Sequence, residues 1–106
     1  MNFFRKKTSA YITLERPDFA AQTGKLWGDL SFALQGHREV RQVTMKLYDN
    51  GDLPLRVVSV IVTLGLKLRA ESVDYELEAS PKTIAMLRRL NLASAFTQLT
   101  EVNDGN

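Results

Sequence analysis

The sequence predicts an α/β protein with a four-stranded, mainly parallel sheet and helices packed on one face, in the order β-β-α-β-α-β-α. Two observations predict it. Short segments alternate apolar and polar residues with a period of two, and longer segments with helical spacing lie between them. Strict alternation indicates a sheet that is covered on one face only, which disfavours a doubly wound sheet buried on both faces. Right-handed crossovers would then place the helices on a common side.

Three segments alternate strictly enough to be predicted as strands. Their inward residues are Ile12 and Leu14 in "AYITLER", Val43, Met45 and Leu47 in "VTMKLY", and Val73, Tyr75, Leu77 and Ala79 in "VDYELEA". The segment "NFFRKK" precedes a turn at Thr8-Ser9, so a hairpin would make it the fourth strand.

The first long helix is predicted over residues 19–35, with Pro17-Asp18 as its start and Gly36 as its stop. Its inward face holds four apolar residues that share one side, together with Trp27, which extends the stripe. These four are Leu26, Leu30, Ala33 and Leu34. Each of Gly24 and Gly28 weakens such a helix by up to about 1 kcal/mol relative to alanine. We therefore expect the two glycines to mark close packing against the sheet.

The last helix is predicted to begin with Ser80 as N-cap and Pro81 in its first turn. The spacing in "SPKTIAMLRRL" directs Ile84, Leu87 and Leu90 inward. A bend and a short helix should follow and dock Phe96. The tail over residues 101–106 should fray.

Residues 55–70 are ambiguous between a helix and a hairpin. The β-branched run favours a strand, and a turn at Leu64-Gly65 would complete the hairpin. The polar residues Arg56, Ser59, Thr63 and Lys67 are instead spaced by three, four and four, which gives one narrow polar stripe on a helix. We prefer the helix, and the hairpin remains the alternative.

Composition narrows the class of protein. The 106 residues suit one domain, 1–106, and the 44% hydrophobic and 25% charged residues are typical of a folded globule. The absence of cysteine favours a reducing, cytoplasmic location, and we expect no secretory signal or membrane insertion, because residues 53–66 are too short to span a bilayer. A net charge of +2 with scattered basic residues does not favour nucleic acid as partner.

The residues that could carry chemistry form no catalytic constellation, so we do not predict an enzyme, a metal site or a cofactor. The single histidine, His37, stands in an expected polar loop without a partner nearby in sequence. Asp49, Asn50 and Asp52 could suggest a cation loop, but they lack the ligand spacing of one. An Asn-Gly turn with positive φ is the simpler interpretation.

Two longer phrases resemble the STAS domain, the family of bacterial anti-sigma factor antagonists. They are "RPDFAAQTGKLWGDL" (residues 16–30) and "KLRAESVDYELEASPKTIAMLRRLNLASAF" (residues 67–96). The resemblance implies a STAS-like sheet and a switch turn after the third strand, where relatives carry a phosphorylated serine. Here that turn is "YDNGDLPLRVV": Asp52 matches the family's aspartate, and the serine position meets Leu53 or Leu55, neither of which accepts phosphate. Ser59, one turn into the helix, reads as a helix residue rather than a substitute phosphosite.

The resemblance implies a non-catalytic regulatory module in signalling or transcription regulation that binds a protein at this turn. The partner classes are a switch kinase, an anti-sigma factor, or an ATPase subunit of a lipid-transport ABC complex. The expected contact residues are Asp52, Leu53, Pro54, Leu55, Arg56 and Ser59. Alternatively, Leu53 and Leu55 enter the core and Pro54 only starts the helix. A second functional alternative is a small ligand or nucleotide bound at the same helix N-terminus.

Overall fold

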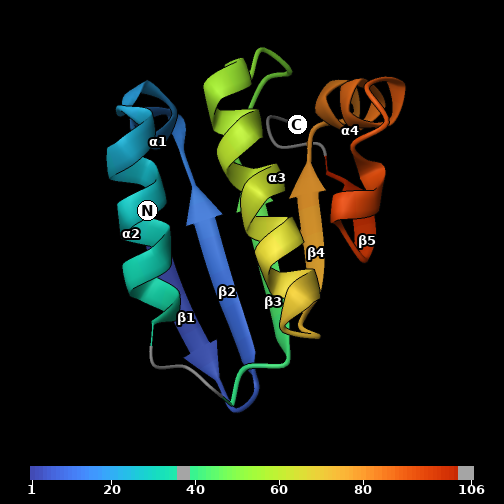
Figure 1. Cartoon of the computed structure of the whole chain (residues 1–106). Coiled ribbons are helices and arrows are strands. Elements are labelled where there is room, and N and C mark those ends of the chain that lie inside the picture. Colours follow the sequence, from blue (N-terminus) through green and yellow to red (C-terminus); the bar gives the residue numbers. More distant parts are fainter. Residues whose placement is uncertain (36–38, 103–106) are drawn as a thin grey trace.

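The computed structural model describes residues 1–35 and 39–102, which form a mixed five-stranded sheet with helices on one face (Figure 1). The strands lie in the order β1-β2-β3-β4-β5; β1 is antiparallel to β2, and the other neighbours are parallel. The elements, in chain order, are β1 (Asn2–Lys6), β2 (Ser9–Leu14), α1 (Arg16–Ala20), α2 (Thr23–Leu34), β3 (Gln42–Leu47), α3 (Leu55–Ala70), β4 (Asp74–Ala79), α4 (Pro81–Arg89), the 3-10 helix η1 (Ala93–Ala95) and β5 (Gln98–Glu101).

The predicted α/β class is confirmed, but the strand count is wrong. The missed strand is β5, which pairs with β4 from Glu76↔Gln98 to Ala79↔Glu101. Its sequence "QLTE" holds a single apolar residue, so it carries no readable alternation. Glu101 therefore belongs to the sheet rather than to a frayed tail, and residues 103–106 lie outside the described part of the chain.

The alternation of the three predicted strands is confirmed in their burial. One row of paired residues crosses the sheet beneath the helices, running Phe3, Ile12, Met45, Leu77 and Leu99 from β1 to β5. The three central members of this row are fully buried. The opposite face carries no helix among the described residues and is mostly polar, with an exposed Phe4–Tyr11 ring pair on β1 and β2 whose centroids lie 5.9 Å apart.

Residues 55–70 form the helix α3, so the hairpin alternative is wrong. The four polar residues that predicted the stripe, Arg56, Ser59, Thr63 and Lys67, are all exposed. Most of the β-branched residues lie on the opposite side, in the core, where Val57, Val60 and Ile61 are buried. Tertiary burial of this apolar face outweighs the strand propensity of the individual residues.

The helix predicted over residues 19–35 is in fact two helices, α1 and α2, separated by extended backbone at Ala21 and Gln22. The helix α1 begins at Arg16, before the predicted start, because Glu15 is its N-cap and Asp18 closes a capping box by accepting from the Glu15 N–H at 2.8 Å. Leu26 and Leu30 of α2 are buried as predicted. Gly36 and His37 lie outside the described residues.

The glycines of α2 are not packing positions. A Cβ atom at Gly24 or Gly28 would meet nothing within 4 Å, and both residues are exposed. The close approach occurs at Gly65 of α3, where a Cβ atom would collide with the Ala95 carbonyl oxygen and lie 3.1 Å from the Tyr75 ring. Helix α3 thus contacts η1 and β4 through its backbone.

Helix α4 begins as predicted. The Ser80 Oγ accepts from the Thr83 N–H at 3.3 Å, and Ile84 and Leu87 are fully buried. The prediction that Leu90 points inward is wrong, because the helix ends at Arg89 and Leu90 is a largely exposed C-cap. The short helix before Phe96 is confirmed as η1, and Phe96 is buried.

Candidate functional site

The turn between β3 and α3 begins with an Asx-type turn. Gly51 has φ of 88°, as expected for an Asn-Gly sequence, and its N–H donates to the Asp49 Oδ2 at 3.0 Å. A side chain at Gly51 would collide with that of Lys82, on α4. The predicted Asn-Gly turn is therefore confirmed, and it lies directly against the N-terminus of α4.

Asp49 joins the two turns at this end of the sheet. Its carboxylate is 7% exposed and accepts three further hydrogen bonds: from the Ser80 N–H at 3.1 Å, from the Ser80 hydroxyl at 2.8 Å, and from the Thr83 hydroxyl. Three of these four donors converge on Oδ2, and the Ser80 N–H donates to Oδ1. Asp49 is therefore a structural carboxylate that links the two turns.

The structure separates the residues predicted to contact a partner. Leu53 is only 9% exposed and belongs to the core, so its assignment as a contact residue is wrong. Its side chain belongs to the same hydrophobic cluster as Val57 and Val58 of α3. Leu55, by contrast, is 72% exposed on the first turn of α3.

Three of the other predicted residues, Asp52, Arg56 and Ser59, are exposed, and Pro54 is half-buried as the N-cap of α3. The Arg56 Nη2 donates to the Phe19 carbonyl oxygen at 2.9 Å and so joins α3 to α1. The Pro54 carbonyl accepts from the N–H groups of Val57 and Val58. Pro54 has no side-chain acceptor, so no side chain of the described residues caps the first turn.

The outer side of α3 carries a row that begins at Leu55 and consists of three apolar residues and one serine. Residues Leu55, Ser59, Val62 and Leu66 are spaced by four, three and four, so they lie along one side of the helix. Leu66 is 54% exposed and Val62 is half-buried. We call these four residues the α3 ridge. Sequence reasoning identified its first turn but missed Val62 and Leu66, whose spacing from Leu55 was the available signal.

The helices around the ridge are basic. Helices α3 and α4 together contain six cationic residues and no aspartate or glutamate; these are Arg56, Lys67, Arg69, Lys82, Arg88 and Arg89. On the opposite face of the sheet, β4 presents Asp74, Glu76 and Glu78. The cations of α3 and α4 favour an acidic partner.

Other kinds of site find little support. Among residues 1–35 and 39–102, no three His, Cys, Asp or Glu side chains come together as metal ligands would.

Burial raises the pKa of the Tyr75 phenol far above its ordinary value of 10.0. Its hydroxyl donates to the Ile61 carbonyl oxygen at 3.2 Å, so the phenol is a neutral core group. Over the described residues, the helices are too short or too polar to cross a membrane.

No family model, curated protein or solved structure matches this chain. The fold and the site define its class: an α/β protein with a mixed five-stranded sheet that is covered on one face by helices and exposes an apolar row among cations.

Proposed function

We propose that the protein is a non-catalytic regulatory module that binds another protein through the α3 ridge and the turn before it. The observation that carries this proposal is Leu55, which is 72% exposed at the start of a well-packed helix. A single exposed leucine is ordinary, but Leu55 begins a row that extends to Leu66, about 16 Å along the helix. Apolar rows on rigid helices are common elements of protein interfaces.

Charge specifies the chemistry of the partner. Six cations on α3 and α4, against the single carboxylate of the α3 C-cap Glu71, favour an acidic surface, and the ridge favours apolar side chains at its centre. Rim cations mainly accelerate association, whereas the apolar centre determines how long the complex lasts. The partner surface is therefore an apolar strip bordered by aspartate and glutamate.

The likeness to STAS domains supports the same surface. In that family the turn after the third strand is the regulatory contact, and here the corresponding turn leads directly into the ridge. A switch kinase, an anti-sigma factor and the ATPase subunit of a lipid-transport complex are the partner classes that the likeness suggests. Because leucine stands where relatives have a phosphorylated serine, binding is not controlled by phosphate at that position.

Affinity capture with matched variants tests the proposal. Leu55→Asp and Ser59→Asp each place a carboxylate in the ridge without touching the core. The control is Phe32→Asp on α2. It replaces an apolar side chain that is 79% exposed, as Leu55 is exposed, but that lies outside the ridge. We expect a partner from the source cell to be retained by the wild type and by the control, and lost with both ridge variants.

The purified partner then gives the quantitative result. Leu55→Asp should weaken its binding by about thirtyfold, which corresponds to about 2 kcal/mol, the size of an interface hot spot. Far-UV circular dichroism should be unchanged in all variants because every substituted side chain is exposed. Capture of the same proteins by the wild type and both ridge variants would contradict the proposal.

A further inference from the structure

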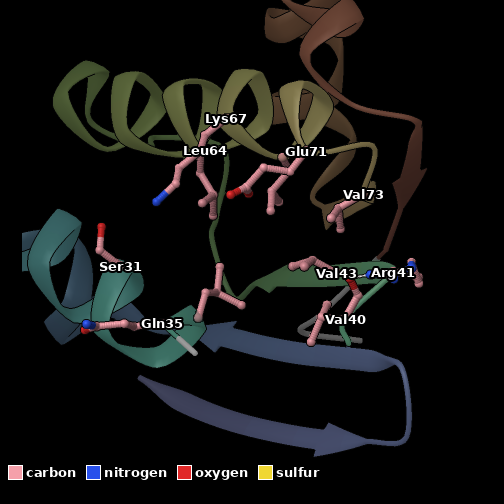
Figure 2. Close-up of a pocket in the computed structure, with 11 residues that line it drawn as sticks. Ser31, Gln35, Val40, Arg41, Val43, Leu64, Lys67, Glu71 and Val73 are labelled. Atoms are coloured by element: carbon pink, nitrogen blue, oxygen red, sulfur yellow. Dashed lines mark hydrogen bonds between the residues drawn. The ribbon is translucent and has the colours of Figure 1, made fainter. Parts of the chain in front are cut away.

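A cleft opens between α2 and α3 at the opposite end of α3 from Leu55. Figure 2 shows it bounded by the end of α2, the C-terminal half of α3 and the beginnings of β3 and β4. Its volume is about 520 Å³, within the range of small-molecule sites. The residues that line it are Ser31, Leu34, Gln35, Val40, Arg41, Val43, Leu64, Lys67, Leu68, Glu71 and Val73.

The interior of the cleft is aliphatic. Six of the lining residues are leucine or valine, and they come from α2, α3, β3 and the segments just before β3 and β4. Leu34 and Val73 are only half-buried although they border the core, so part of their apolar surface faces the cleft rather than a neighbour. A ligand with an apolar body would cover that surface, and covering it is favourable by about 25 cal/mol per Å².

The mouth of the cleft carries two opposite charges on one helix. Lys67 lies in the last turn of α3 and Glu71 is the C-cap residue four positions later, and Figure 2 shows both side chains extending into the gap toward α2. Neither side chain forms an ion pair or hydrogen bond with any of the residues that the structure describes; the two residues are joined only through the backbone, where the Glu71 N–H donates to the Lys67 carbonyl oxygen at 3.2 Å. Across the gap, the Ser31 hydroxyl of α2 points toward α3 (Figure 2).

We propose that this cleft binds a free amino acid with an apolar side chain. Its carboxylate would bind the Lys67 ammonium and the Ser31 hydroxyl, its α-ammonium would bind the Glu71 carboxylate, and its side chain would contact the aliphatic interior. A fatty acid fits less well because Glu71 repels a second carboxylate beside Lys67. An uncharged apolar compound would form no ion pair with Lys67 or Glu71.

Three ligands of nearly the same shape test each part of this assignment. Phenylalanine has both charges, hydrocinnamate lacks the ammonium, and phenethylamine lacks the carboxylate. Each is titrated into the isotope-labelled full chain, and the backbone amide resonances are followed by NMR. We expect phenylalanine to shift the resonances of Ser31, Leu64, Lys67 and Glu71, and the other two ligands to bind at least about tenfold more weakly.

Two substitutions test the residues at the mouth. Lys67→Gln and Glu71→Gln should each weaken phenylalanine binding about tenfold, whereas the control Arg69→Gln, on α3 but outside the cleft, should leave it unchanged. Leucine should bind as phenylalanine does, and glutamate should not bind. The proposal is overturned if phenylalanine shifts no resonance at millimolar concentration, if the shifts lie elsewhere, or if hydrocinnamate binds equally well. None of these outcomes depends on the partner proposed for the α3 ridge.

Discussion

A single residue, Asp49, determines how the end of the sheet near the ridge is held together. Its buried carboxylate accepts from Gly51 in its own turn and from Ser80 and Thr83 at the start of α4. Ser80 and Thr83 lie 31 and 34 positions from Asp49 along the chain. The turn before α3 and the N-terminus of α4 are therefore one hydrogen-bonded unit.

Replacing Asp49 should destabilise the whole protein. Asp49→Ala leaves the Thr83 hydroxyl and the Ser80 N–H without their acceptor in a buried site, and we expect a loss of about 2 to 3 kcal/mol in the free energy of unfolding. Urea denaturation followed by circular dichroism measures it. The control Asp52→Ala removes an exposed carboxylate from the same turn and should change stability by less than about 0.5 kcal/mol. Equal stability of the two variants would show that Asp49 is dispensable.

Tyr75 should make stability depend on pH in the alkaline range. Burial raises the pKa of its phenol above the ordinary value of 10.0, so the folded protein keeps the phenol neutral where the unfolded chain ionises it. This contribution is complete below pH 10 and is lost as the pH rises above it. The free energy of unfolding should thus fall more steeply above pH 10 in the wild type than in Tyr75→Phe. Parallel pH profiles for the two proteins would contradict this assignment.

Among the elements, α3 shows why glycine has opposite effects at different helix positions. Gly65 lies against the Ala95 carbonyl and the Tyr75 ring, whereas Gly28 on α2 faces open space. A methyl group therefore meets a fixed backbone atom in one case and only solvent in the other. Composition and helical spacing treat the two positions alike, because their difference depends on η1, some 30 residues further along the chain from Gly65.

This difference predicts opposite signs for the same substitution. Gly65→Ala should destabilise by about 1 to 3 kcal/mol, because α3 must move away from η1 to admit the methyl group. Gly28→Ala should stabilise by up to about 1 kcal/mol through helix propensity alone. Thermal unfolding of both variants measures the pair. A stabilising Gly65→Ala would mean that α3 does not pack against Ala95 as described.

The same dependence on distant contacts limits what could be predicted of the elements and the site. Alternation identified β2, β3 and β4, and the spacing from Arg56 to Lys67 identified α3, since both patterns are local consequences of one buried face. Strand β5 was missed because its pairing with β4, rather than its own sequence, makes it a strand. Likewise, the exposure of Leu55 and Arg56 on the first turn of α3 agrees with the helical pattern, but the role of Asp49 and the burial of Leu53 required the tertiary structure.

On the scale of the whole molecule, the sheet is open at both edges and strongest at its centre. Strand β3 has parallel neighbours on both sides, whereas β1 and β5 each pair on one side only. The inward residues of β3, which are Val43, Met45 and Leu47, are all fully buried. Stability should therefore decrease from the centre of the sheet toward its edges.

Native-state hydrogen exchange tests this gradient. The amides of β3 should exchange only through global unfolding, whereas those of β5 should exchange at least about tenfold faster through local opening of an edge strand of four residues. The dependence of the exchange rates on denaturant, measured by NMR, separates the two routes. Equal protection of β5 and β3 would mean that the sheet unfolds as a unit up to its edge.

The close contact of α3 with η1 at Gly65 also has a thermodynamic consequence for the binding of a partner. Because the helix backbone rests on η1 and Tyr75, and its first turn is joined to α1 through Arg56, the ridge is already ordered before any partner arrives. Association then sacrifices the freedom of a few exposed side chains, at about 0.5 to 1.5 kcal/mol each, and none of the entropy of folding a helix. A surface built this way loses little entropy on binding, which suits the reversible partner binding that we propose.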